Sequence, residues 1–250
     1  MSFRPRSLLR PLKPLYVALQ SHLRRRRIRL LVAQLRSVAR TPEAILPIVV
    51  RLHDAWGNQS FTADVGFLEE MVERTLASRG PFLDCGSGIS TVILGALTSG
   101  SSDVVWSLEQ DEHWYRDMRD CLQMLELTDV QLLFAPLVIS GDVTWYSFEH
   151  ARFPTAFPLI LCDGPAVHRS EWPADVFKSW RAGVVNELRR RGVSFETIVL
   201  DDAHDPRCGA LIDAWRNAGL QVETVVTPTG SHVVAHSSRS TQDSEHATEA

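Results

Sequence analysis

Short apolar runs alternate with segments of helical spacing along most of this chain. Five runs rich in Val, Ile, Leu and Phe predict buried strands at 81–85, 104–108, 130–134, 158–162 and 197–200. Before and between them, apolar positions recur every three or four residues, which predicts helices over 63–78, 90–98, 112–125, 173–191 and 206–218. Strands that alternate with helices indicate a doubly wound α/β fold with a parallel sheet.

The last two apolar runs, Gln221 to Val226 and His232 to His236, are separated by only five residues. A parallel crossover needs a dozen or more residues, so we expect an antiparallel hairpin here. The expected sheet is then seven-stranded and mostly parallel, with a C-terminal antiparallel hairpin strand. The remaining residues, 237–250, are rich in Ser, Thr, His and Glu, and we expect a disordered tail.

The amino-terminal residues 1–57 are expected to form a basic helical arm. Three prolines predict that the first fifteen residues are irregular or only briefly helical. A helix from Ser21 is indicated by an apolar stripe (Ile28, Leu31, Val32, Leu35, Val38) among arginines. A second short apolar segment covers 44–52. The basic helix either lies on an anionic membrane through residues 21–40, covers a partner, or packs on the domain with its arginines in water.

Charge is divided unevenly along the chain. Residues 1–40 hold eleven of the 26 Lys and Arg and no acid, so the remainder carries fifteen bases against all thirty acids. An acidic body argues against a nucleic-acid-binding core. No apolar run is long enough to span a membrane. The four cysteines are far apart, which supports neither a zinc site nor a disulfide framework and favours a cytoplasmic location, with peripheral membrane attachment through the arm left open.

One loop carries the strongest chemical signal. The strand at 81–85 leads through Gly86, Ser87 and Gly88 into a helix that opens near Ser90, which provides close backbone approach and unpaired N–H groups. A dinucleotide site expects a third glycine, but Thr91 stands there. Asp84 at the strand end suits a cationic ligand better than a diphosphate. The pattern D-x-G-x-G therefore indicates S-adenosylmethionine (SAM), a sulfonium with an ammonium group.

The segment Asp84-Cys-Gly-Ser-Gly-Ile-Ser-Thr91 resembles the first motif of class I SAM-dependent methyltransferases. The resemblance covers residues 58–236, implies a Rossmann-like SAM-binding domain there, and is closest in pattern to predicted bacterial O-methyltransferases. The closing hairpin agrees with it, since an antiparallel last strand is the hallmark of that sheet. The resemblance implies that the cofactor contacts six residues in and around this loop: Asp84, Gly86, Ser87, Gly88, Ser90 and Thr91.

Further cofactor contacts are expected after the next two strands. Glu109 follows the second strand, where a carboxylate can accept both ribose hydroxyls, and Gln110 is its neighbour. Ala135 follows the third strand, where the family contacts adenine. We also expect Asp163, after the fourth strand, to lie beside the cofactor.

Three aspartates are expected at the same edge of the sheet. Asp163 ends the fourth strand, and Asp201 and Asp202 end the fifth. They resemble the magnesium ligands of cation-dependent O-methyltransferases, and hard cations prefer oxygen ligands. The chain departs from that family at Pro165 and Ala166, where a catalytic residue is often found.

His168 and His204 are the candidates for the general base, because a histidine pKa suits proton removal from an acceptor, and Asp163 is also expected to be catalytic. Trp56, Trp145, Tyr146 and Trp172 either line an acceptor pocket or fill the core. The sequence thus predicts methyl transfer from SAM, with magnesium where the aspartates require it, to an oxygen of a small molecule or sugar. A catalytically inactive SAM-binding module recruited by the basic arm, and an NAD(P)-binding oxidoreductase, are the alternatives.

Overall fold

Seven strands form one sheet at the centre of the computed structural model, which describes residues 12–57, 62–140, 143–150, 152–165, 183–205 and 208–237. The strand order is β3-β2-β1-β6-β7-β9-β8. The strands are β1 (Phe82–Cys85), β2 (Val105–Glu109), β3 (Val130–Phe134), β6 (Ala156–Cys162), β7 (Ser194–Leu200), β8 (Leu220–Val226) and β9 (Ser231–Ser237). Only β9 runs against its neighbours, pairing antiparallel with β7 and with β8. The predicted fold class is confirmed.

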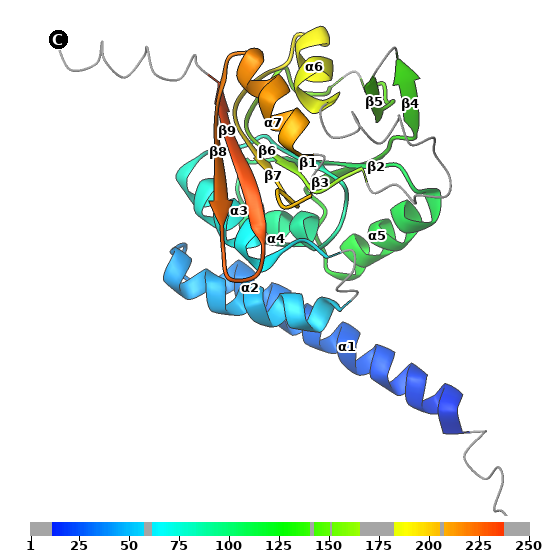
Figure 1. Cartoon of the computed structure of the whole chain (residues 1–250). Coiled ribbons are helices and arrows are strands. Elements are labelled where there is room, and N and C mark those ends of the chain that lie inside the picture. The colour runs from blue at the N-terminus through cyan, green and yellow to red at the C-terminus, as the bar shows by residue number, and fades with distance from the viewer. Residues whose placement is uncertain are drawn as a thin grey trace, which may run out of the picture.

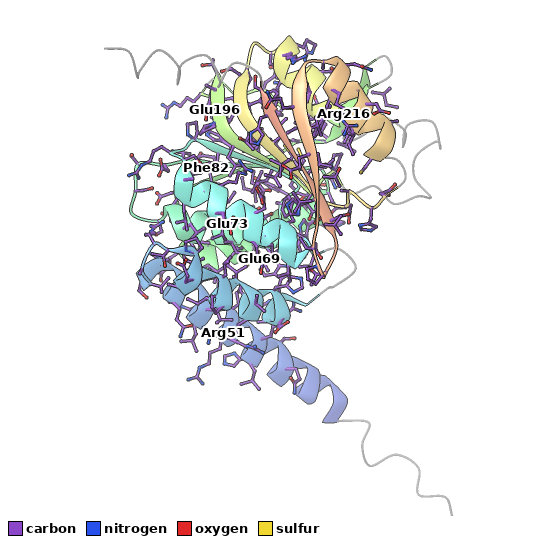
Figure 2. The ribbon with its side chains drawn as sticks, turned by 60° about the vertical axis from the view of Figure 1, so that its left-hand side comes forward. Arg51, Glu69, Glu73, Phe82, Glu196 and Arg216 are labelled. Carbon is purple, nitrogen blue, oxygen red and sulfur yellow. The ribbon has the colours of Figure 1, made fainter. Side chains whose placement is uncertain are left out.

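Helices cover both faces of the sheet (Figure 1). One face is covered by α3 (Val65–Ala77), α4 (Ile89–Thr98) and α5 (Glu112–Met124), and the other by α6 (Gly183–Arg190) and α7 (Cys208–Asn217). Because successive strand residues point to opposite faces, neighbours such as Phe82 and Leu83 belong to two different cores. Figure 2 marks the outer layers, with Arg51 on α2 at one side and Arg216 on α7 at the other.

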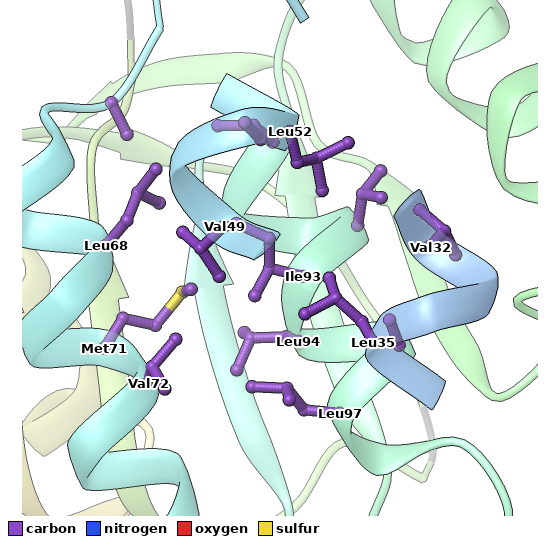
Figure 3. Close-up of a cluster of buried hydrophobic side chains, with 14 of the residues drawn as sticks. Val32, Leu35, Val49, Leu52, Leu68, Met71, Val72, Ile93, Leu94 and Leu97 are labelled. Carbon is purple, nitrogen blue, oxygen red and sulfur yellow. The ribbon is translucent and has the colours of Figure 1, made fainter. Parts of the chain in front are cut away.

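A further helical layer lies outside α3 and α4, formed by α1 (Leu12–Ser37) and α2 (Pro42–Trp56). Every residue of α4 is buried, since the sheet lies on one side and these helices on the other, which suits its nearly all-apolar sequence. The shared core is drawn in Figure 3, where side chains of all four helices meet. The apolar stripe of the amino-terminal helix therefore packs on the body of the protein.

Two local expectations need correction. The first helix begins at Leu12, inside the stretch expected to be irregular, because Pro14 falls in its first turn, where backbone N–H groups have no helical acceptor. An unexpected antiparallel hairpin, β4 (Leu137–Ser140) with β5 (Val143–Tyr146), follows β3.

Some expectations lie outside the described residues. These are the first part of the helix expected over 173–191, the start of that over 206–218, and the tail from residue 238. Among the described residues, no helix has both the length and the apolar character that crossing a membrane requires.

Candidate functional site

The predicted site residues gather at one edge of the sheet, where β1, β2, β6 and β7 end. In open α/β sheets ligands bind beyond the carboxyl ends of the strands. Asp84 lies near the end of β1, Glu109 ends β2, Asp163 follows β6, and Asp201 follows β7. The register places these ends next to one another, because β1 pairs with both β2 and β6, and β6 pairs with β7.

Asp84 is fully buried and joins β1 to the first turn of α4. Thr91 Oγ1 donates to Asp84 Oδ2 at 2.5 Å, and Ser90 Oγ donates to the same oxygen at 3.1 Å. Thr91 Oγ1 also accepts from the N–H of Gly88 at 3.0 Å. The pKa of Asp84 is raised to about 7, mainly because the group is buried. The hydrogen bonds from Thr91 and Ser90 oppose this shift, and the charge of Glu109 adds to it. The hydroxyls predicted to touch the cofactor therefore hold this carboxyl group in place.

The two glycines of the loop have different surroundings. Gly86 has a φ of +106°, and a Cβ added there would lie 2.7 Å from the nitrogen of Gly164. The N–H of Gly164 donates to the carbonyl of Cys85 at 2.6 Å, so the loop after β6 rests on the loop after β1. At Gly88, an added Cβ would meet nothing within 4 Å. Gly86 therefore allows contact between two protein loops, and Gly88 has open space beside its Cα.

Glu109 is buried at the end of β2, beside the glycine loop. Ser87 Oγ donates to Glu109 Oε2 at 2.6 Å, and the N–H of Asp111 donates to Oε1 at 2.8 Å. Burial is the main cause of its raised pKa, and the Ser87 hydrogen bond opposes the shift. The buried Ala135 donates its N–H to the Glu109 carbonyl at 2.7 Å, and Gln110 is half-buried. Ala135, predicted near adenine, thus lies beside Glu109, predicted near ribose, and the two are joined through their backbones.

Trp114 also contacts the glycine loop, which the sequence did not indicate. Its indole Nε1–H donates to the carbonyl of Ser87 at 2.8 Å. The side chain comes from the first turn of α5, whose N-cap is Asp111. Helical spacing alone does not distinguish a tryptophan that only packs its helix from one that also bonds to a neighbouring loop.

The buried Asp201 directs its side-chain oxygens at backbone N–H groups. Oδ2 accepts from the backbone N–H of Asp64 at 2.9 Å, and Oδ1 accepts from the backbone N–H of Asp202 at 2.8 Å. The pKa of Asp201 is raised to about 7, mainly by burial and also by the neighbouring charge of Asp163. Asp202 has a positive φ of 58°, which aspartate tolerates better than most residues.

These aspartates do not form a preformed magnesium site. Within the described ranges, no group of three or more His, Cys, Asp or Glu side chains is arranged to hold a metal ion. Both oxygens of Asp201 accept hydrogen bonds from backbone N–H groups. The predicted set Asp163, Asp201 and Asp202 thus gains no support from the described side chains.

The candidates for proton removal are only partly placed. Asp163 is half-buried at the end of β6, and His204 is exposed in the turn after β7. His168 and Trp172 lie outside the described residues.

Tyr146, at the end of β5, is a buried group that the sequence left undecided. Its hydroxyl has no hydrogen-bond partner in the described part of the chain, and it lies 2.5 Å from where a Cβ on Gly164 would be. Burial raises its pKa well above the ordinary value. Trp56 and Trp145 are buried too, so the described aromatic candidates fill the core.

The signal for the β4–β5 hairpin was present in Ser140-Gly-Asp-Val143, since Gly-Asp between two β-rich runs favours a tight turn.

Comparison with known proteins supports the fold. No family model and no curated protein matches the sequence. Among solved structures, the SAH-bound methyltransferase PaMTH1 of Podospora anserina has a TM-score of 0.50 at 13% identity, covering 75% of this chain and 82% of that chain. The precorrin-6y C5,15-methyltransferase of Geobacter metallireducens GS-15 has a TM-score of 0.46 at 13% identity, covering 72% and 96%. A putative O-methyltransferase from Klebsiella pneumoniae has a TM-score of 0.44 at 18% identity, covering 68% of this chain and 78% of that chain. The chain has the Rossmann-like methyltransferase fold, which it shares with PaMTH1.

Proposed function

We propose that this protein is a SAM-dependent methyltransferase that transfers the methyl group to an oxygen of a small-molecule or sugar acceptor. The observation that carries the proposal is the pair of buried carboxyl groups, Asp84 and Glu109, on either side of a glycine loop whose Gly88 faces open space. The antiparallel β9 supports the same conclusion, because dinucleotide-binding sheets are usually parallel at that edge. The presence of SAH in the structure of PaMTH1 is consistent with it.

The chain's own residues fit such a cofactor. Glu109 is buried and has no basic partner in the described part of the chain, so its carboxylate oxygens can accept from ribose hydroxyls. Gly88 leaves room for close backbone approach. The carboxyl group of Asp84 supplies negative charge beneath the loop, and a cationic ligand would favour its ionised form. When bound, SAM supplies an electrophilic methyl group on its sulfonium.

Methylation of a hydroxyl also requires a group that accepts its proton. Asp163 is our first choice, because it follows β6 directly and remains half-buried beside the glycine loop. His204 and His168 remain predictions for the same task. We propose no step through a metal ion, since the described side chains do not fit one.

Calorimetric titration of the full-length protein with SAH, the demethylated product of SAM, tests cofactor binding. We expect binding to one site, and a loss of at least tenfold in affinity in Glu109→Gln, because hydrogen bonds to a charged acceptor are worth roughly 1.5–3 kcal/mol. Glu112→Gln is the matched control, an exposed glutamate on α5 that should leave the affinity unchanged. A wild-type protein that binds neither SAM nor SAH would refute the proposal.

Two further measurements separate the alternatives. Transfer of a labelled methyl group from SAM to a panel of hydroxyl-bearing small molecules tests the reaction, and binding without transfer to any of them would favour an inactive module. Thermal stabilisation by NADH in place of SAH would favour an oxidoreductase.

A further inference from the structure

The helix α1 is fixed to the body by one of its sides. Ile28, Leu31, Val32 and Leu35 are buried in the core shared with α2 and α4. Arg24 Nε donates to the carbonyl of Ala55 at 3.0 Å, at the carboxyl end of α2, where the helix dipole favours a positive charge. This apolar stripe and Arg24 are therefore occupied within the protein and are not available to a partner.

The opposite side of α1 combines exposed leucines with arginines. Leu23 is 47% exposed and Leu30 is 58% exposed, and Arg26 and Arg27 lie between them at helical spacings of three and four. Arg25, Arg29 and Arg36 are exposed beside this row. In the described part of the chain, none of the arginines from 25 to 29 forms an ion pair with an acid. We call Leu23, Arg26, Arg27 and Leu30 the outward row.

The position of α1 leaves the outward row accessible to a large surface. The amino-terminal half of the helix projects past the rest of the molecule (Figure 1). No acidic residue precedes Glu43, whereas residues 41–250 hold twice as many acids as bases. An anionic surface would therefore attract the arm and repel the body, which confines contact to α1.

We propose that α1 docks on an anionic lipid surface through the outward row, with the arginines at lipid phosphates and the leucines among the headgroups. Apolar side chains beside basic ones are typical of helices that lie in a membrane interface. A nucleic acid would engage the arginines but not the leucines, and residues 20–40 contain no Phe, Tyr or Trp on which bases could stack. The membrane attachment left open by the sequence is thus assigned to the side of the helix opposite its apolar stripe.

Flotation of the full-length protein with vesicles tests this assignment. We expect flotation with vesicles that contain phosphatidylglycerol and not with phosphatidylcholine alone. Arg26→Glu/Arg27→Glu and Leu23→Asn/Leu30→Asn should each reduce the bound fraction at least tenfold. Their matched controls are Arg216→Glu on α7 and Val226→Asn on β8, exposed residues far from α1 in sequence, and both should float like the wild type. All four variants should keep the wild-type melting temperature and SAH affinity, since no buried contact changes.

Three results would overturn the proposal. One is no flotation, or equal flotation with both kinds of vesicle. Another is loss of flotation in the controls, or its retention in both outward-row variants. The last is that the arginines instead bind RNA, or a second copy of the chain detected by light scattering, while vesicles are ignored. Because SAH binding is measured on the same samples, failure of membrane docking is distinguishable from failure of the proposed function.

Discussion

Asp84 is a carboxyl group in a setting that makes its ionisation unfavourable. It has no exposed surface and, among the residues that the structure describes, no basic partner; the hydroxyls of Ser90 and Thr91 donate to it. Its pKa is raised from 3.8 to about 7, mainly because burial penalises the charged form. In the absence of a ligand, the folded protein therefore holds a proton here that the unfolded chain releases near pH 4.

This proton predicts a specific pH dependence of stability. Between about pH 4 and pH 7 the folded state binds one more proton at Asp84 than the unfolded state, so stability falls as pH rises through this window and levels off above it. The difference in unfolding free energy between the wild type and Asp84→Asn should fall by roughly 1.4 kcal/mol per pH unit in the window. Denaturant unfolding of both proteins at several pH values measures it. Asp201 is present in both proteins, so its contribution to the pH dependence should cancel in the difference. A difference that does not vary with pH would contradict the raised pKa of Asp84.

The sequence predicted which carboxylates lie at the site but not what they touch. Asp84 and Glu109 were found because each follows a short buried run, and strand ends of a parallel sheet meet at one edge. The contact of Gly86 with Gly164 joins residues far apart in the chain, and neither glycine signals its partner. The bond from Asp64 to Asp201 was hidden for the same reason, since Asp64 precedes Asp201 by 137 residues.

At the scale of elements, the loops after β1 and β6 rest on each other with no room for a side chain. A Cβ on Gly164 would lie 2.5 Å from the Tyr146 hydroxyl, 2.6 Å from the Gly86 Cα and 2.9 Å from the Cys85 carbonyl. Two of these three neighbours are backbone atoms, and the third belongs to a buried ring of the β4–β5 hairpin. The hairpin, β1 and β6 are thus held at a fixed spacing.

Gly164→Ala should therefore destabilise the protein by about 1–3 kcal/mol, the usual effect of overpacking a closed site. Gly209→Ala is the matched control, because an added Cβ in this helix α7 position meets nothing within 4 Å. The control should be neutral or stabilise by up to about 1 kcal/mol, since alanine is the better helix former. Equal stability of the two variants in urea unfolding would show that the loops separate easily.

The sheet strands were predicted from their apolar runs, whereas the β4–β5 hairpin and the start of α1 were not predicted. The seven sheet strands lie within a few residues of their expected positions because each contains a short apolar run, although β3 and β8 at the sheet edges are largely unburied. The β4–β5 hairpin was missed because its strands have only four residues each, too few for a periodic pattern to be distinctive. The start of α1 was missed because a proline signal was applied to a first turn, where it does not break the helix.

At the scale of the whole molecule, the basic arm shares its core with the α/β body. Val32 and Leu35 of α1 lie in the same cluster as Val49, Leu52 and Ile93 (Figure 3). Removal of α1 would expose this cluster to water. Tests of the arm are for this reason better made with surface substitutions in the full chain than by truncation.

A pair of leucines measures the contribution of α1 to global stability. Leu35 is fully buried, so Leu35→Ala should lower the unfolding free energy by about 2–5 kcal/mol. Leu30→Ala, on the exposed side of the same helix, should change it by no more than about 0.5 kcal/mol. Chemical unfolding followed by circular dichroism gives both values. A small effect of Leu35→Ala would mean that α1 unfolds separately from the sheet.

If the protein is the two-substrate enzyme proposed above, the contact between Gly86 and Gly164 would couple the affinity for a cofactor at the loop after β1 to that for an acceptor at the loop after β6. A ligand held by the loop after β1 cannot displace that loop without moving the loop after β6. The two binding events then share a coupling free energy, and linkage makes it reciprocal: whatever factor the first ligand contributes to the affinity of the second, the second returns to the first. Cooperativity between donor and acceptor would in this protein arise from two backbones that touch.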